Sequence, residues 1–295
     1  MIAADATAQP IGRDLMLVEC PRDAMQGWPH HIPTADKTAY LNTLLKVGFD
    51  VLDFGSFVSP KAIPQLADTK ELIPQLQLGD GRTKLLAIIA NTRGAEEAVV
   101  YDEISILGFP FSISETFQQR NTNKSIAQSL VQVEDIQRLC TQRNKELVVY
   151  ISMGFGNPYG DNYSAEVAIK WVEKLAALGI ATIAMSDTVG IADKGTIDYV
   201  FRQLIPAFPS VSIGAHFHAS FDNWEEKLST AYAAGCKRFD SALKGIGGCP
   251  MAKDELVGNM ATENVIDWCD RNDIYLHLDR AALQESMAIA NRIFV

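Results

Sequence analysis

The chain alternates short apolar runs with helical patterns, and this alternation limits the folds it can adopt more than any single motif does. Eight runs have the composition of buried strands: 15–19, 51–56, 84–90, 103–109, 147–153, 181–187, 212–218 and 238–243. Amphipathic segments closed by glycine lie between most of them, such as SAEVAIKWVEKLAALG and NWEEKLSTAYAAG. Strands that alternate with helices pair in parallel through right-handed crossovers. Eight such units predict an α/β fold, a (β/α)8 TIM barrel.

The same pattern decides the domain organisation. An open doubly wound sheet also alternates strands with helices, but no expected strand is followed by the GxGxxG turn typical of that fold. The sequence contains no repeat of solenoid length and no low-complexity linker. We therefore predict a single barrel domain over residues 1–295, with 262–295 as a C-terminal helical tail. In the first long helical segment, Thr34 is the expected N-cap and Gly48 the expected C-cap.

Composition narrows the range of partners. The formal net charge of −10 gives no support for nucleic-acid or anionic-membrane binding. No apolar run reaches the length of about 20 residues that a membrane-spanning helix needs, and the first residues lack the basic start and apolar core of a secretion signal. Five scattered cysteines without a CxxC pair favour reduced thiols. We therefore expect a cytoplasmic protein that binds neither nucleic acid nor a membrane.

Polar residues gather where the expected strands end. In a TIM barrel, the carboxyl ends of the strands and the loops that follow them form the active site. Together with the glycine-rich segment after the last strand, these ends carry Arg22, Asp23, Asp53, Asp187, His216, His218 and Cys249. Each residue alone is consistent with a loop-capping role, because Asp and His often cap loops. Their joint placement on at least five strand ends favours one shared site.

The stretch SIGAHFHAS places two histidines on one face of a strand. His216 and His218 point one way and Phe217 points the other. Two imidazoles, a carboxylate and an amide oxygen suit octahedral Mg²⁺ or Mn²⁺, and the lack of a cysteine near the histidines in the sequence argues against a thiolate zinc site. A strand end held by hydrogen bonds is the alternative. Ser212 and Gly214 are small and leave room for a ligand on the same face.

The segment GIGGCPMA carries Cys249 on a glycine-rich loop. Three glycines within four residues give a permissive backbone just before the cysteine. A thiol on such a loop beside a cation has a lowered pKa and can exchange protons near neutral pH. A small apolar cysteine buried under a turn explains the residue equally well. The residue pattern leaves both interpretations of Cys249 open.

Five segments occur in an order that resembles a known family: PRDAMQ, FGSFVSPKAIPQLAD, SDTVG, HFH, and GIGGCPMA followed by GNMATE. In these segments the chain resembles the 3-hydroxy-3-methylglutaryl-CoA lyases, over nearly its whole length. The resemblance implies a (β/α)8 barrel in a superfamily of metal-dependent lyases and aldolases. It implies cleavage of 3-hydroxy-3-methylglutaryl-CoA to acetoacetate and acetyl-CoA, in leucine catabolism. It further implies an acyl-CoA-type substrate and a homo-oligomer, a dimer.

The resemblance also assigns roles to individual residues. It implies that a divalent cation, Mg²⁺ or Mn²⁺, is held by Asp23, His216, His218 and Asn259. Arg22 would polarise the thioester carbonyl, and Cys249 would be the acid/base on the loop, with His216 as a second candidate for that proton transfer. The remaining implied groups are two active-site carboxylates, Asp53 and Asp187, and three substrate-binding residues, Gln26, Ser114 and Glu263.

This sequence departs from the family at several positions near the expected site. The family usually has glutamate where Asp53 stands, and it has an aspartate at Ala219 that could orient the metal ligands. It typically has glycine at Ala24 and cysteine at Met153. The loop after Gln26 reads GWPHH where the family has a lysine that helps to hold the CoA phosphates. We expect metal binding and retro-aldol chemistry to survive these changes, while the acyl group and its carrier stay open.

Two other functions are compatible with the sequence. A related aldolase or condensing acyltransferase would use the same barrel and metal. The altered GWPHH loop is compatible with this hypothesis, whereas the glycine–cysteine loop favours the lyase. A barrel that binds a ligand without turnover is the third possibility. The intact set of Arg22, Asp23, His216, His218 and Asn259 argues against it, because polar groups in a disused site are costly to keep.

Overall fold

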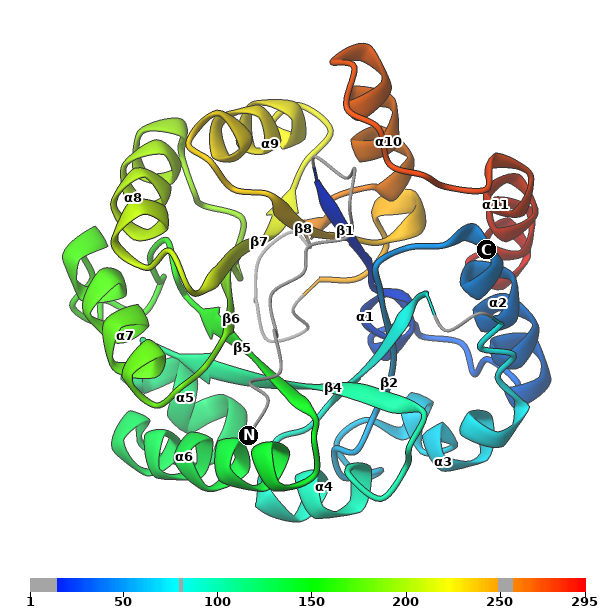
Figure 1. Cartoon of the computed structure of the whole chain (residues 1–295), viewed down its shortest axis with the longest axis horizontal. Helices are drawn as coiled ribbons and strands as arrows, with labels where there is room; N and C mark the ends of the chain where they lie inside the picture. The colour runs from blue at the N-terminus through cyan, green and yellow to red at the C-terminus, as the bar shows by residue number, and fades with distance from the viewer. Residues whose placement is uncertain (1–14, 80–81, 249–256) are drawn as a thin grey trace, which may run out of the picture.

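A closed barrel of eight parallel strands forms the centre of the molecule (Figure 1). The computed structural model describes residues 15–79, 82–248 and 257–295. The barrel strands are β1 (Met16–Glu19), β2 (Val51–Ser56), β3 (Lys84–Ile88), β4 (Ile104–Ser112), β5 (Glu146–Ser152), β6 (Thr182–Asp187), β7 (Ser212–Ala219) and β8 (Arg238–Ser241). Each strand pairs with its neighbours in chain order, and the β8–β1 pairing closes the ring. The predicted fold class is therefore confirmed.

Each predicted strand is present, and the ends differ by at most a few residues. The β2 segment matches its predicted range, and β4 continues to Ser112 beyond the predicted end at Phe109. Nearly all residues of the central strands are buried, because the helical ring covers one face and the packed barrel interior the other. Apolar, β-branched runs are the composition that such doubly buried strands need.

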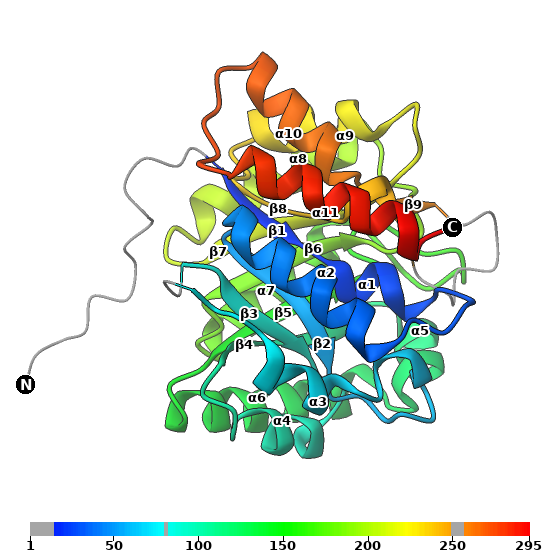
Figure 2. The same cartoon turned by 90° about the vertical axis from the view of Figure 1, so that its right-hand side faces the viewer.

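Helices cover the outside of the barrel. They are α1 (Pro21–Gln26), α2 (Thr34–Val47), α3 (Thr69–Leu72), α4 (Thr92–Ala98), α5 (Glu115–Thr122), α6 (Ile126–Gln142), α7 (Ala165–Ala177), α8 (Lys194–Ala207), α9 (Trp224–Ala233), α10 (Thr262–Arg271) and α11 (Arg280–Ile293). A short strand, β9 (Gly258–Asn259), pairs antiparallel with β7. The last helix lies alongside α2 (Figure 2), so the C-terminal segment belongs to the outer layer.

The helix predicted from Thr34 to Gly48 is α2, but Thr34 is not its N-cap. Pro33 occupies the cap position, where its fixed φ of −59° suits the start of a helix. The hydroxyl of Thr34 instead donates a 2.7 Å hydrogen bond to Oδ2 of Asp68. Gly48 ends the helix as predicted, in the left-handed conformation with φ 84°.

Side chains of β7 alternate between the two faces of the barrel wall. Phe217 points outward and packs against Phe155 and Phe201, with ring centroids 5.6 and 6.2 Å apart. The space that the sequence predicted for a ligand over Gly214 is occupied: a Cβ at this position would lie 2.9 Å from Nη1 of Arg238. That prediction was wrong, because a buried arginine of the neighbouring strand fills the gap that the glycine leaves.

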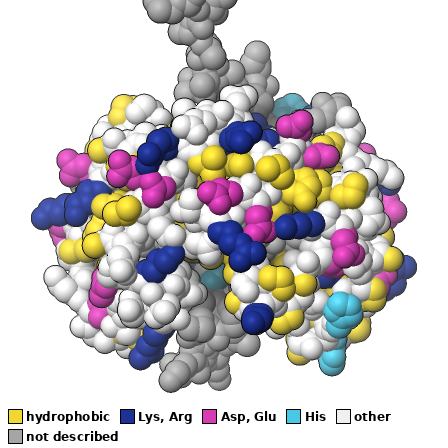
Figure 3. Space-filling model, turned by 90° about the horizontal axis from the view of Figure 1, so that it is seen from below, with side chains coloured by type: hydrophobic (Ala, Val, Ile, Leu, Met, Phe, Trp, Pro, Cys, Tyr) yellow, Lys and Arg dark blue, Asp and Glu magenta, His cyan; other side chains and the backbone are white. Residues whose placement is uncertain are grey.

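The surface carries both signs of charge. On the face drawn in Figure 3, acidic and basic side chains are interspersed with apolar ones. Within the described part of the chain, no helix combines the length and the apolar character that crossing a bilayer requires.

Glu19 joins the barrel wall to the helical layer. Its Oε1 accepts a 2.9 Å hydrogen bond from the backbone N–H of Leu243, and its Oε2 contacts the hydroxyl of Thr262 at the start of α10. That hydroxyl also lies 2.8 Å from Oγ of Ser241. A threonine hydroxyl has one proton, so Thr262 donates to Glu19 and accepts from the hydroxyl of Ser241. Burial raises the pKa of Glu19 to about 8, although the hydrogen bonds from Thr262 and Leu243 oppose the shift.

We predict that Glu19 makes the stability of the fold depend on pH. The unfolded carboxyl ionises near pH 4.5, whereas the folded one keeps its proton until about pH 8, so the folded state binds the proton more tightly. The free energy of unfolding should therefore fall by up to about 1.4 kcal/mol per pH unit between about pH 5 and pH 8. Glu19→Gln keeps a neutral hydrogen-bonding side chain and should lack this component. Urea unfolding of both proteins at pH 5 and pH 8 measures the difference; identical pH profiles would contradict the assignment.

Candidate active site

Arg22 is the centre of a buried ion-pair network at the start of α1. Pro21 begins this helix directly after β1, which places Arg22 and Asp23 at the carboxyl end of the barrel. Nη1 of Arg22 donates hydrogen bonds to Oδ1 of Asp23 (2.8 Å) and to Oε1 of Gln26 (2.9 Å). Nε and Nη2 donate to the carboxylate of Asp53, with the shortest contact 2.5 Å. Three side chains thus fix the plane of the guanidinium.

Asp53 comes from the middle of β2 and is 1% exposed. The pairing of β2 with β3 shifts between Asp53 and Gly55, an irregularity of the kind that re-aims side chains next to active sites. Burial raises the pKa of Asp53 to about 6, although Arg22 opposes the shift. The carboxyl that is one methylene shorter than the family's glutamate still makes a direct ion pair with Arg22.

Asp23, His216 and His218 form a group that could hold a metal ion. One ligand atom from each lies within 4.8 Å of the others. Burial favours the neutral acid at Asp23, but the charges of Arg22 and the two histidines outweigh it, so the pKa of Asp23 is lowered. The carboxylate is therefore ionised at neutral pH and available to a cation.

Asn259 joins this group through the short strand β9. It lies directly opposite His218 in the antiparallel pairing with β7. Its Nδ2 donates to Oδ2 of Asp23 (2.6 Å) and to the carbonyl of Ile246 (2.9 Å). Both amide protons are used by these two bonds, so Oδ1 is the amide atom left for a cation.

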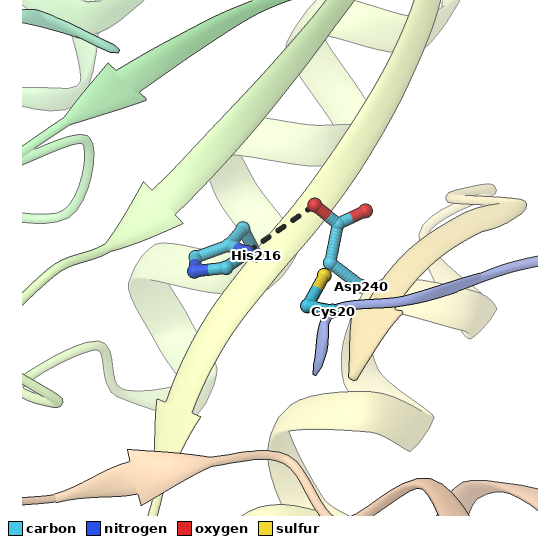
Figure 4. Close-up of side chains that lie close together, drawn as sticks. All are labelled: Cys20, His216 and Asp240. Atoms are coloured by element: carbon cyan, nitrogen blue, oxygen red, sulfur yellow. Dashed lines mark hydrogen bonds and ion pairs between the residues drawn. The ribbon is translucent and has the colours of Figure 1, made fainter. Parts of the chain in front are cut away.

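Both imidazoles are held by their Nδ1 atoms. Nδ1 of His218 lies 2.9 Å from the carbonyl oxygen of Thr188, in the SDTVG motif, and Nδ1 of His216 lies 3.2 Å from Oδ2 of Asp240 (Figure 4). Burial lowers the pKa of His218, helped by the neighbouring His216. At His216 burial acts in the same direction, but Asp240 outweighs it and raises the pKa. Each ring is therefore oriented by its Nδ1 contact, while Nε2 has no hydrogen-bond partner in the part of the chain that the structure describes.

The chemistry of these donors fits a divalent cation. One carboxylate, two imidazole nitrogens and one amide oxygen make a mixed N/O set without sulfur, and such sets suit Mg²⁺ or Mn²⁺ with open positions for water and substrate. The aspartate that the family has at Ala219 is not needed to orient the histidines, because Asp240 and the Thr188 carbonyl perform this task.

Asp187 lies next to this group and forms an ion pair with a buried lysine, Lys227. Its Oδ2 accepts a 2.6 Å hydrogen bond from Nζ of Lys227, on α9, and its Oδ1 accepts one from the backbone N–H of Ala192. Lys227 also donates to the carbonyls of Gly190 and His218, each at 2.9 Å. The pair therefore fixes the end of β7, where His218 lies, and both oxygens of Asp187 already have partners.

The three predicted substrate-binding residues make contacts of their own. Gln26 accepts from Arg22, as described. Ser114 caps α5, accepting from the N–H of Phe117 while its hydroxyl donates to Asp161. Glu263, in the first turn of α10, accepts a 3.0 Å hydrogen bond from the N–H of Lys244. Cys249 lies outside the described residues.

Sequence reasoning missed four residues that shape the site: Cys20, Thr188, Lys227 and Asp240. Asp240 and Arg238 share the inward face of β8, and charged residues at alternate positions of a strand that is otherwise buried were a signal for inward polar groups. Lys227 gave no signal, since a lysine in an amphipathic helix ordinarily faces solvent. Cys20 lies beside His216 and Asp240 (Figure 4), although no cysteine is near the histidines in the sequence.

Comparison with known proteins relates this geometry to one family. A family model described as HMGL-like matches residues 16–291. The chain is 33% identical over 254 residues to the hydroxymethylglutaryl-CoA lyase YngG of Bacillus subtilis, which covers 86% of this chain and 84% of that protein. It is 32% identical over 280 residues to the 3-hydroxy-3-isohexenylglutaryl-CoA/hydroxy-methylglutaryl-CoA lyase of Pseudomonas aeruginosa, covering 93% and 91%. The structure of an HMG-CoA lyase from Acinetobacter baumannii in complex with coenzyme A and 3-methylmalate has a TM-score of 0.87 at 29% identity, covering 95% and 91%.

We predict that His216→Ala lowers the affinity for Mn²⁺ by at least about tenfold, because a small ligand set loses one member. Electron paramagnetic resonance of free Mn²⁺ measures the dissociation constant without any substrate. His30→Ala, which removes an exposed histidine of the loop after α1, is the matched control and should bind Mn²⁺ like the unchanged protein. Equal affinities in all three proteins would place the metal elsewhere.

We predict that disruption of the buried Lys227–Asp187 pair strongly lowers the stability of the fold. The side chains of Lys227 and Asp187 are 3% and 1% exposed, so Lys227→Met leaves a buried carboxylate without its partner and should lower the free energy of unfolding by about 3–5 kcal/mol. Lys70→Met removes an ion pair with Glu97 whose lysine is 53% exposed, and it should change stability by less than about 1 kcal/mol. Urea unfolding of the two variants makes the comparison; similar losses in both would mean that the buried pair has no special role.

Proposed function

The chain belongs to the HMGL-like family, and on this basis we propose that it is a metal-dependent carbon–carbon lyase that cleaves 3-hydroxy-3-methylglutaryl-CoA to acetoacetate and acetyl-CoA. The observation that carries the proposal is the joint arrangement of Arg22, fixed by Asp53 and Asp23, beside the metal-binding group of Asp23, His216 and His218. The reaction needs both parts. Its substrate must lose a proton from a tertiary hydroxyl, and its product forms through a thioester enolate.

Asp23, His216, His218 and Asn259 would hold Mg²⁺ or Mn²⁺. When bound, the cation supplies positive charge that lowers the pKa of the substrate's C3 hydroxyl and so favours its deprotonation. The protein's own contribution is to keep the four donors in place: Lys227 fixes the strand end at His218, and Arg22 and Asn259 orient the two oxygens of Asp23.

Arg22 stabilises the negative charge that appears when the C2–C3 bond breaks. A guanidinium has five N–H donors. Nε donates its N–H to Asp53, and Nη1 donates one N–H to Asp23 and the other to Gln26. Nη2 donates one N–H to Asp53, so its second N–H has no partner among the described residues. A hydrogen bond from this N–H to the thioester oxygen would stabilise the negative charge that develops on that oxygen in the transition state. Asp53 acts through Arg22 by holding the guanidinium still.

The enolate carbon must then receive a proton. We propose Cys249, on the glycine-rich loop, as the donor, with His216 as the alternative. Glu263 supports the start of this loop by binding the N–H of Lys244. Ser114 and Asp161 join the loops after β4 and β5 at the same end of the barrel, which would shape the surface that the substrate meets.

The carrier and the cellular setting belong to the same proposal. The relatives act on CoA thioesters by name, and one similar structure contains coenzyme A, so we propose CoA as the carrier. The described cysteines are all buried and unpaired, which is compatible with a reducing cytoplasm. We propose a homodimer as the working state.

The experiment that tests the function is a cleavage assay. Purified protein with Mg²⁺ or Mn²⁺ should convert 3-hydroxy-3-methylglutaryl-CoA to acetoacetate and acetyl-CoA, a chelator should abolish the reaction, and added metal should restore it. Arg22→Gln should lower kcat by on the order of a thousandfold with a smaller change in KM, because the lost donor acts mainly in the transition state.

Three outcomes would contradict the proposal. If no acetoacetate forms while a pyruvate-releasing or condensing reaction proceeds, the chain is an aldolase or synthase. If the protein binds metal and CoA thioesters without turnover, it is a ligand-binding barrel. If Arg22→Gln changes KM alone, Arg22 binds substrate and does not stabilise the enolate.

A further inference from the structure

Beneath the metal-binding group lies a second cluster of potential metal ligands. Cys20, His216 and Asp240 each offer one ligand atom, and these atoms lie within 4.8 Å of one another. Figure 4 shows the sulfur of Cys20 beside the carboxylate of Asp240, on the side of the His216 ring that faces Oδ2 of Asp240. Cys20 is 1% exposed and Asp240 3%. The three residues come from the end of β1 and from the neighbouring strands β7 and β8.

The charges around the sulfur are suited to a cation. Burial raises the pKa of the Cys20 thiol well above its ordinary value, and the carboxylates of Asp240, Asp53 and Asp23 raise it further, opposed by Arg22. These three carboxylates provide the negative charge that a cation at the sulfur would meet. Oδ1 of Asp240 forms a 2.8 Å ion pair with Nη1 of Arg238, which leaves Oδ2 directed at the cluster. Among the described residues, the thiol has only one weak polar contact, a 4.0 Å approach to the carbonyl of Val18. A thiolate, a carboxylate and an imidazole together form a donor set that a thiophilic ion prefers to Mg²⁺.

His216 belongs to both clusters, and its tautomer decides between them. A neutral imidazole carries one proton, on Nδ1 or on Nε2. While Nδ1–H donates to Asp240, Nε2 is free for the upper group with Asp23 and His218. An ion bound between Cys20 and Asp240 would take Nδ1, move the proton to Nε2 and remove His216 from the upper group. The two sites therefore exclude each other through one side chain.

We propose that Cys20, His216 and Asp240 form a second metal site, which takes a thiophilic divalent ion such as Zn²⁺ or Cd²⁺ and antagonises the upper site. As the metal–sulfur bond forms, the thiol proton of Cys20 is released to solvent; no oxidant or reductant takes part. The site needs no lyase activity, and only its antagonism depends on the upper group being a metal site.

Titration with Cd²⁺ alone tests the site in metal-free protein, because a cadmium–thiolate bond absorbs in the ultraviolet. Cys249→Ser serves as the background, so that the loop thiol gives no signal. This protein should show one cadmium–thiolate band, which disappears in Cys20→Ser/Cys249→Ser and survives in the matched control Cys140→Ser/Cys249→Ser, where another buried cysteine is replaced. In the Cys249→Ser background, saturating Mn²⁺ should weaken the apparent Cd²⁺ affinity at least tenfold.

A band that persists after Cys20→Ser, or that is lost with Cys140→Ser, overturns the site. A Cd²⁺ affinity unaffected by Mn²⁺ overturns the antagonism and leaves the site itself standing. Because Cys20 is buried and its variant could fold poorly, crystals of the unchanged protein grown with Cd²⁺ provide a second test. The anomalous peak is expected between Sγ of Cys20 and His216, and its absence there refutes the proposal. Loss of lyase activity, by contrast, bears on the proposed function alone.

Discussion

The register in which β7, β8 and β1 close the barrel determines the polar interior of this protein. His216 lies opposite Asp240 and Gly214 opposite Arg238, while β1 pairs with the other edge of β8. Inward side chains recur every two residues, so a slip of one residue would turn both histidines toward the helices and bring Phe217 into the barrel. The aromatic contact of Phe217 with Phe201 on α8 therefore helps to hold the register. The register in turn decides that Arg238, Asp240 and the two imidazoles all point into the barrel.

Buried charge imposes the second constraint, because each ion removed from water needs a partner. The cations and carboxylates that form the pairs come largely from different βα units. Arg22 of α1 meets Asp53 of β2, and Lys227 of α9 meets Asp187 of β6. These pairs join neighbouring units at the carboxyl end of the barrel. The charged residues that form the site therefore also stabilise the end of the barrel. Removal of one partner leaves an unpaired buried charge on the neighbouring βα unit.

How much the sequence could predict follows from the range of each interaction. The strands and the alternation of Phe217 with the histidines depend on local periodicity, and these predictions were confirmed. Contacts made by closure of the barrel carry no local signal: Cys20 and His216 are far apart in the sequence, and Arg238 fills the space over Gly214 from another strand. Thr34 is not the N-cap because it is already the first residue of the helix, after Pro33 in the cap position, and its hydroxyl donates to Asp68 of a distant loop. The roles proposed for Asp187, Ser114 and Glu263 came from the family resemblance, and they remain predictions beside the structural contacts that these residues make.

The departures from the family fall into two physical groups. Ala219 and Asp53 change the interior, yet the interior compensates: Asp240 and the Thr188 carbonyl orient the histidines, and the shorter carboxyl of Asp53 still pairs with Arg22. The GWPHH loop changes the rim, and there the new residues are fixed in place. Trp28 packs edge-on against Phe294 at 5.2 Å, and Gln65 binds the loop backbone at His30 and Ile32. The interior therefore keeps the contacts that orient Arg22 and the two histidines, and the loop at the rim is held by an aromatic contact and by hydrogen bonds to its backbone.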